Sequence, residues 1–170
     1  MGLARWLLTG GLLWQGGVMY RQSLERKVKY EAARAYANSM GKPLLVVGGP
    51  YGSNPLRHIF LTPAHGYGDV CLDIDPEACM NCPKGCKVEV ADVRDIPYPD
   101  GYFASALVSH CLEHLDTVAD CQQAWVELHR VSDAVFVAGP SKSSLLAWLI
   151  PDHHLWVEQQ ADGSLRVEQR

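Results

Sequence analysis

The sequence lacks several features that would assign a function directly. No long basic stripe runs through its 170 residues, and the net charge is -4 with a pI of about 5.9. The chain therefore lacks the basic patch that nucleic-acid-binding proteins use to bind phosphates. No internal repeat or low-complexity segment is visible, and no A-x-A-like cleavage site follows the apolar N-terminal run. These absences argue against a nucleic-acid partner and against a small secreted domain held by disulfides.

An apolar run of full bilayer length is also missing, although the N-terminus comes close to one. Residues 6–20 carry no charge, but this run is shorter than the roughly 20 residues of a membrane span and contains Gln15 and four glycines. Trp6 and Tyr20 stand at its ends, where interfacial aromatics belong, and basic residues follow it. We expect residues 3–20 to associate with a membrane, as a single-pass anchor or an interfacial helix, with the globular domain on the cytoplasmic side. A helix buried against a partner and a cleaved targeting segment are the alternatives.

The helix is expected to continue beyond this run. An apolar residue recurs every four positions and so predicts one shared face, made of Leu24, Val28, Ala32, Tyr36 and Met40. Gly41 and Pro43 then form a stop signal. We therefore divide the chain into an N-terminal helix, residues 1–40, and one domain, residues 41–170, on which the second half of the helix packs.

Short apolar runs follow Pro43 and alternate with a helical pattern. Strands are expected at 44–47, 69–74, 104–109 and 134–138, with a helix over 118–131. This alternation predicts an α/β fold with a mostly parallel sheet buried on both faces. Residues 154–158 and 164–168 alternate around an Asp-Gly turn, which predicts an antiparallel hairpin at the edge of the sheet.

The ends of the first two strands suggest a nucleoside site. The first strand runs into a turn that contains Gly48, Gly49 and Gly52, and glycines let backbone approach a ligand closely. Asp73 ends the next strand, roughly 20 residues on, a spacing at which a carboxylate can accept hydrogen bonds from both ribose hydroxyls. Either feature alone also fits an ordinary turn, but the two together are more specific.

A longer motif follows in residues 92–115, DVRDIPYPDGYFASALVSHCLEHL. It resembles a signature of class I S-adenosylmethionine-dependent methyltransferases, in their small-molecule, type 11-like branch. Residues 96–100 and Phe103 match that branch's Leu-Pro-Phe-Pro-Asp and Phe-Asp frame, and residues 110–115 match its Leu-x-His-Leu-like end. The resemblance covers roughly residues 42–140. It implies a Rossmann-like three-layer sandwich and methyl transfer to a small acceptor. The membrane association expected for residues 3–20 would favour a membrane-associated, lipid-soluble acceptor.

The resemblance also implies which residues hold S-adenosylmethionine at the carboxyl ends of the strands. The three glycines of the first turn would line the methionine side, and Asp73 would hold the ribose with Ile74 against the adenine. Asp92 would accept the adenine amino group, with Val93 contributing a backbone contact. Ser109 and His110 would lie beneath the sulfonium, and His110 is the candidate catalytic base.

Two positions depart from the family pattern and support an alternative function. The family's first motif has an acid in the strand and a glycine in the turn where this chain has Val46 and Pro50. Proline cannot donate a backbone N–H and has a restricted φ. The alternative is a catalytically inactive methyltransferase-like subunit that docks onto protein subunits of a membrane or other large assembly.

Three of the six cysteines lie close together in the sequence. Cys79, Cys82 and Cys86 form a C-x2-C-x3-C motif that could bind zinc tetrahedrally with a fourth donor. Cys71 or a histidine could supply that donor. No second C-x2-C follows, so free thiols or a local redox pair remain the alternative. Residues 110–114 also spell the H-x-x-E-H of inverted zinc peptidases, but the methyltransferase frame accounts for the same letters.

Overall fold

A five-stranded parallel sheet forms the centre of the molecule. The computed structural model describes residues 2–49, 66–79, 82 and 84–170. The strands follow the order β3-β2-β1-β4-β5, and every neighbouring pair is parallel. Their bounds are β1 (Leu44–Val47), β2 (Val70–Asp73), β3 (Lys87–Val90), β4 (Phe103–Ser109) and β5 (Ser132–Ala138). The predicted α/β fold is confirmed, but β3 was not predicted, because its KVEV sequence carries charges at an exposed sheet edge.

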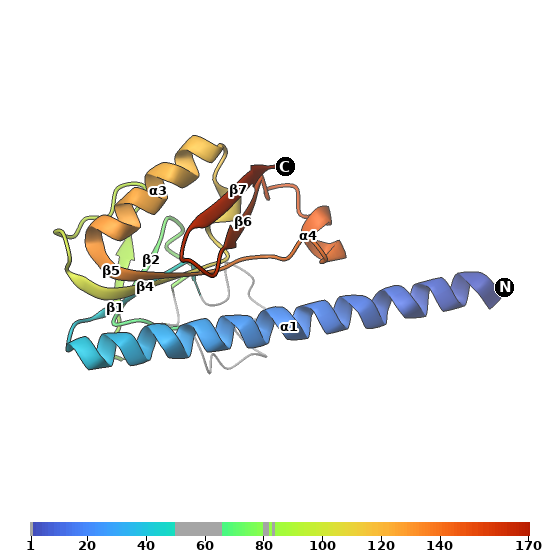
Figure 1. Cartoon of the computed structure of the whole chain (residues 1–170), viewed down its shortest axis with the longest axis horizontal. Helices are drawn as coiled ribbons and strands as arrows, with labels where there is room; N and C mark the ends of the chain where they lie inside the picture. The colour runs from blue at the N-terminus through green and yellow to red at the C-terminus, as the bar shows by residue number, and fades with distance from the viewer. Residues whose placement is uncertain (1, 50–65, 80–81, 83) are drawn as a thin grey trace.

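Helices cover the two faces of the sheet (Figure 1), which gives the expected three-layer arrangement. Helix α1 (Gly2–Met40) runs along one face and α3 (Val118–Val131) along the other. The side chain of Thr117 caps α3 by accepting a hydrogen bond from the backbone of Asp120. The buried stripe of α3 faces the sheet and consists of Cys121, Ala124, Leu128 and Val131.

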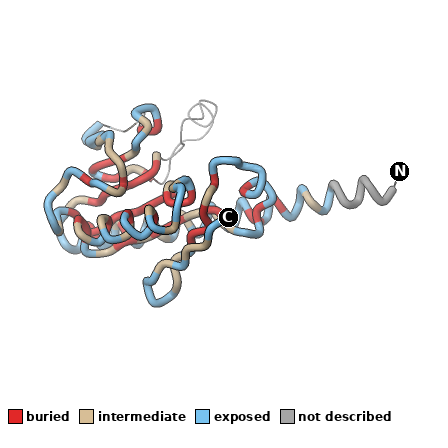
Figure 2. The backbone as a smooth tube through the Cα atoms, turned by 90° about the horizontal axis from the view of Figure 1, so that it is seen from above, coloured by how far each residue is buried: buried red, intermediate tan, exposed pale blue. Residues whose placement is uncertain are grey.

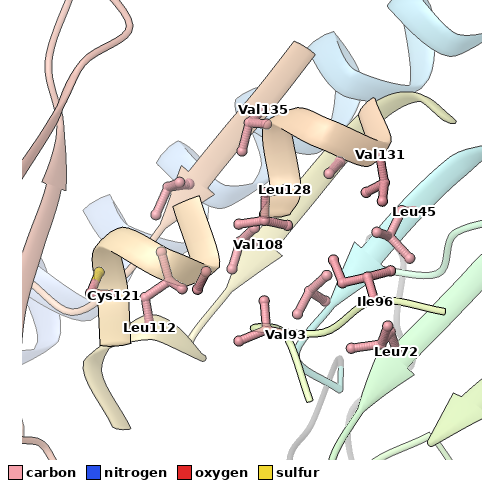
Figure 3. Close-up of a cluster of buried hydrophobic side chains, with 14 of the residues drawn as sticks. Leu45, Leu72, Val93, Ile96, Val108, Leu112, Cys121, Leu128, Val131 and Val135 are labelled. Atoms are coloured by element: carbon pink, nitrogen blue, oxygen red, sulfur yellow. The ribbon is translucent and has the colours of Figure 1, made fainter. Parts of the chain in front are cut away.

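Alternate strand residues supply two separate cores. The core between the sheet and α3 contains Leu45, Leu72 and Val108, together with Ile96 from the loop after β3 (Figure 3). Other strand residues point to the opposite face, where a smaller core forms under α1. Its members from the strands are Leu44, Val46, Cys71, Ala104 and Leu107. Burial on both faces explains why these strands read as continuous apolar runs.

Helix α1 packs on the sheet through small side chains. Ala33 and Ala37 are fully buried, and Tyr30 adjoins them. The second half of the helix therefore packs on the domain as predicted, but the predicted face is wrong. Its large residues remain 36–63% exposed, namely Leu24, Val28, Tyr36 and Met40. Residues spaced strictly four apart drift about 40° around a helix at each step, so they do not stay on one face. Residues 30, 33 and 37 are three and four apart, which follows the helical period and keeps them facing the sheet.

The N-terminal half of α1 extends beyond the sheet (Figure 2). Among the residues that the structure describes, no helix has a stretch long and apolar enough to cross a bilayer, so the single-pass anchor predicted for residues 3–20 is not supported. Gln15, which interrupts the apolar run, is buried. Its amide donates to Ser144 Oγ and its carbonyl accepts from the backbone N–H of Leu145. Gln15 thereby joins α1 to the start of the short helix α4 (Leu145–Leu149).

The C-terminal hairpin is confirmed, but not its predicted place at the edge of the main sheet. Strands β6 (Leu155–Gln159) and β7 (Leu165–Gln169) pair antiparallel and form a two-stranded sheet of their own. The side-chain amide of Gln159 accepts from Val137 N and donates to Val135 O. A side chain therefore makes the hydrogen bonds to β5 that strand pairing would otherwise supply.

Candidate functional site

A cavity of about 250 Å³ opens at the carboxyl ends of β1, β2 and β4. Open parallel sheets bind ligands at the carboxyl ends of their strands, at the point where the strand order changes direction. In this sheet the order runs one way from β1 to β3 and the other way from β4 to β5, so that point lies at β1. The cavity brings together five of the residues predicted to bind the cofactor, which are Asp73, Ile74, Asp92, Val93 and His110.

A second cavity of about 410 Å³ adjoins the first and shares Asp73, His110 and His114 with it. Gly49 lines this second cavity. Its far wall comes from the N-terminal helix and from the segment around α4, including Gln15, Gln22, Arg26, Ala147 and Ile150. The contribution of α1 was missed from the sequence, where residues 3–20 suggested a membrane or partner contact rather than part of a site.

The glycines after β1 are required by close backbone contacts. Gly48 has φ +84°, and a Cβ there would lie 2.2 Å from the carbonyl oxygen of Ser109. A Cβ on Gly49 would lie 2.2 Å from the carbonyl oxygen of Ala78. Gly48 and Ser109 are both buried beneath the cavities and line neither of them. Gly52 lies outside the described residues.

Asp73 is held in place with acceptor capacity left over. Its Oδ2 accepts from Gly49 N at 2.8 Å, and its Oδ1 accepts from Asp75 N at 3.0 Å. A carboxylate offers about four acceptor positions. Two positions therefore remain for ligand hydroxyls, and the bond from Gly49 ties the turn after β1 to the end of β2.

Asp92 is engaged by Arg94, an arrangement that the sequence analysis missed. The guanidinium reaches both carboxylate oxygens, with Nε at 3.0 and 3.1 Å and Nη2 at 2.6 Å, and the backbone N–H of Arg94 adds a bond of 2.8 Å. Arg94 Nη1 also binds Asp120 of α3 at 2.7 Å. Arg94 holds the pKa of Asp92 below its ordinary value. The carboxylate predicted to accept the adenine amino group is thus largely occupied by the protein. The Asp-x-Arg spacing was the available signal.

His110 occupies a strained position at the end of β4. Its φ of +52° is the only positive φ at a non-glycine residue within the described part of the chain. Such strain costs on the order of 1–3 kcal/mol and clusters at functional sites. His110 Nδ1 lies 3.2 Å from Glu113 Oε1. Because an ionised carboxylate only accepts hydrogen bonds, Nδ1 carries the proton and Nε2 is left as the base.

Glu113 is a buried carboxylate that supports His110. It belongs to the short 3-10 helix η1 (Leu112–His114) and is 1% exposed. Burial raises the pKa of Glu113, whereas the hydrogen bond with His110 lowers it, and the net shift is downward. The ionised state of Glu113 is therefore maintained by the histidine that it orients.

Two further histidines line the second cavity beside this pair. The rings of His114 and His153 meet edge to face at 4.8 Å, and both offer nitrogen atoms within 4.8 Å of a Glu113 oxygen. Burial lowers the pKa of His153, and its Nδ1 has no hydrogen-bond partner among the described residues. His110 lies before η1, so His110 and His114 do not share a helix as the peptidase motif would require.

The cysteines predicted to bind metal lie away from both cavities. Cys79 belongs to the core under α1, and Cys82 and Cys86 pack at its margin. None of the three lines either cavity.

A family model described as "Methyltransferase domain" matches residues 54–134. The match includes Asp73, Asp92 and His110, and it ends within β5. It begins beyond Val46 and Pro50, so the two departures in the first motif lie outside it. No curated protein matches the chain in sequence.

Three solved structures illustrate the likeness in fold. A protein from Pyrococcus horikoshii has a TM-score of 0.47 and 16% identity, covering 88% of this chain and 72% of its own. The N-methyltransferase NodS from Bradyrhizobium japonicum, solved with S-adenosyl-homocysteine, has a TM-score of 0.40 and 14% identity. That match covers 63% of this chain and only 57% of that NodS chain. A Burkholderia thailandensis 1,6-didemethyltoxoflavin-N1-methyltransferase has a TM-score of 0.40 and 12% identity, covering 98% and 88%.

The similarity to these solved structures is too weak to transfer a substrate or a partner. The sequence match covers residues 54–134, just under half of the chain, and shows that this part is similar to a methyltransferase domain. The observed strand order, with helices on both faces of a parallel sheet, is that of a Rossmann-like α/β fold.

Proposed function

We propose that this protein transfers a methyl group from S-adenosylmethionine to a small acceptor held in the second cavity. The observation that carries the proposal is the meeting of Asp73 and His110 at two adjoining cavities, within the segment that matches a methyltransferase domain. The first cavity would take the adenosyl group and the second the acceptor.

The residues of the first cavity fit most of an adenosyl group. Asp73 has two acceptor positions left for ribose hydroxyls, and Ile74, Val93 and Leu115 offer apolar walls for a purine. Asp92 fits less well, because Arg94 already binds both of its oxygens. When bound, S-adenosylmethionine supplies a methyl group that is already activated for transfer.

His110 is placed to take a proton from the acceptor. It lines both cavities, and Nε2 is its basic nitrogen. Glu113 orients the ring and would stabilise the imidazolium that forms. Positioned general bases contribute roughly 10²–10⁴-fold to rate. The remaining work of the protein is to orient the acceptor and exclude water.

We propose further that the acceptor is membrane-associated and that the protein works at a membrane surface. The N-terminal half of α1 and the α4 segment lie side by side, because Trp14 Nε1 donates to the carbonyl of Ser143. Both elements expose large apolar side chains, including Leu12, Leu13, Tyr20, Leu146 and Leu149. The same two elements form the far wall of the second cavity. A lipid-soluble acceptor would therefore have a short route from the bilayer interface into the site.

One observation favours a second candidate function, a catalytically inactive docking subunit. Arg94 satisfies the carboxylate that would otherwise recognise adenine. An enzyme that had lost its cofactor would tolerate such a pairing, since the fold benefits from the link between Asp92 and α3.

Calorimetric titration of the full chain with S-adenosylmethionine and S-adenosylhomocysteine separates the two functions. We expect micromolar binding, and Asp73→Asn should weaken it by roughly 10–100-fold, the equivalent of losing hydrogen bonds to a charged group. Asp95→Asn is the matched control, because Asp95 is exposed and lines neither cavity. A folded wild-type chain that shows no heat at millimolar ligand would leave the docking subunit as the function.

A further inference from the structure

Four cysteines gather on the α1 side of the sheet. Cys71 lies in the middle of β2 and points toward α1, whereas Leu72 beside it lines the cavity. The Sγ atoms of Cys71, Cys82 and Cys86 all lie within 4.8 Å of one another. Cys79 packs in the same buried cluster as Cys71, and its backbone carbonyl accepts from Cys82 N–H. All four cysteines are free of disulfides. Of the two fourth donors that the sequence left open, the structure thus favours Cys71 over a histidine.

The backbone around these thiols directs them to one point. The N–H of Cys82 donates to the carbonyl of Cys79 at 3.1 Å, which keeps these two cysteines close together. Gly85, with φ +100°, brings the chain back to Cys86 just before β3. Strands β2 and β3 are neighbours, and Cys71 pairs in register with Val88. The loop therefore leaves and rejoins the sheet next to Cys71.

The spacing suits a tetrahedral metal better than a disulfide. Zinc–sulfur bonds of about 2.3 Å place the sulfurs of a tetrahedral site roughly 3.8 Å apart. The three mutually close thiols would need to contract by at most about 1 Å to reach that geometry. A disulfide would instead need two sulfurs at about 2.05 Å, and it would leave the other two thiols without a role.

A metal here would also stabilise a part of the sheet, the α1-side face of β2, that buries little apolar side-chain area. Helix α1 contacts β1, β4 and β5, and β2 lies beyond those strands on the other side. Within the described residues, the cysteine loop is what packs over the α1-side face of β2, and only Cys71 and Cys79 of the cluster are fully buried. A few thiols bury little apolar area, whereas structural zinc contributes directly to folding free energy.

We propose that Cys71, Cys79, Cys82 and Cys86 bind one zinc ion as a structural tetrathiolate site that holds the loop between β2 and β3 against the sheet. The site is independent of the proposed methyl transfer, since none of its ligands lines a cavity. Its failure would leave that function intact, and the converse also holds.

Metal analysis of the full chain, purified without added metal or chelator, tests the site. We expect about one zinc per chain, as a single tetrahedral site requires. Cys82→Ser and Cys86→Ser should each weaken zinc binding by more than roughly 100-fold, because each removes a direct ligand. Cys121→Ala is the matched control and should keep its zinc, since Cys121 lies in the core on the other side of the sheet.

Cobalt substitution of the wild type keeps the test decisive if a serine variant fails to fold. Wild-type protein stripped of zinc and refilled with cobalt should show strong thiolate-to-cobalt charge transfer and the visible bands of tetrahedral cobalt. Zinc removal should also lower the melting temperature, and adding zinc back should restore it. Absence of both zinc and the cobalt spectrum in wild type, zinc retained by both folded serine variants, or a disulfide among these cysteines in freshly purified protein would overturn the proposal.

Discussion

At the residue scale, His110 combines two features that packing alone does not explain. Its left-handed backbone conformation is uncommon outside glycine, although Asn, Asp and His adopt it more often than other residues. In this conformation the imidazole lines both cavities, and the buried Glu113 is within hydrogen-bond distance of the ring. A histidine with a buried carboxylate partner and a free Nε2 is suited to proton transfer.

We predict that His110→Ala lowers methyl transfer by roughly 10²-fold or more while cofactor affinity changes only a few-fold. Activity against a panel of small and lipid-soluble acceptors would be measured, together with the calorimetric affinity for S-adenosylmethionine. His129→Ala serves as the control, because His129 packs against Trp125 on α3 and lines neither cavity. Equal losses in both variants would show that His110 acts through stability rather than as a base.

At the element scale, α3 holds the loop that carries the Ile-Pro-Tyr-Pro-Asp motif. Arg130 donates to the carbonyls of Ile96 and Tyr98 and to the carboxylate of Asp100. Glu127 accepts from the backbone N–H of Ile96 at 2.9 Å and also binds Arg130. The motif that most resembled the family signature therefore positions a loop against a helix, and that loop follows directly on Asp92 and Val93.

The substitution Glu127→Gln should weaken the contact between α3 and this loop, and the loss of stability should depend on pH. The hydrogen bond from Arg130 holds the pKa of Glu127 below its ordinary value, even though burial acts in the opposite direction. Its stabilisation is therefore fully present above the unfolded-state pKa of about 4.3 and is lost as pH falls through the lower folded-state pKa. We expect the variant to be about 1–3 kcal/mol less stable near neutral pH.

Urea unfolding from pH 7 down to pH 3 measures the free energy of unfolding of wild type and variant. The gap in this free energy between wild type and Glu127→Gln should narrow below about pH 4.3. Glu158→Gln on the exposed face of the hairpin should show no such gap. A gap for Glu127→Gln that stays constant across the whole range would contradict an ionic contribution.

At the scale of the whole molecule, α1 and α4 form an apolar surface beside the second cavity. Leu13 and Leu149 are 74% and 76% exposed. The basic residues Arg21, Lys27 and Lys29 follow on α1. Apolar side chains next to basic ones are typical of helices that bind at the interface of anionic membranes.

We predict that the full chain sediments with vesicles containing anionic lipid, and that binding weakens in high salt. The double variant Leu13→Glu with Leu149→Glu should bind on the order of 100-fold more weakly, since each leucine contributes roughly 1.5–3 kcal/mol when buried. Val126→Glu is the control, because Val126 is 69% exposed on α3, away from this surface. Failure of the wild type to sediment, or an equal loss in the control, would rule out the membrane surface as the site of action.

Local patterns in the sequence were sufficient for most of the architecture. The helix at 118–131, four of the five parallel strands and the C-terminal hairpin follow from apolar periodicity, which depends only on neighbouring residues. Edge strand β3 and the packing face of α1 did not follow. Partial exposure leaves no apolar run in an edge strand, and small alanines give a weak hydrophobic signal.

The sequence by itself determined the fold class, the family resemblance and the acids at the strand ends, because each depends on spacing along one segment. Only the tertiary structure decided which segments meet. It brought Arg94 onto Asp92, Glu113 onto His110, α1 onto the second cavity and Cys71 into the cysteine cluster. Two of these contacts join residues from separate elements, and the other two depend on how a short turn is bent. Neither kind of information is carried by periodicity, which is why the chemistry of the site emerged only when the sheet was assembled.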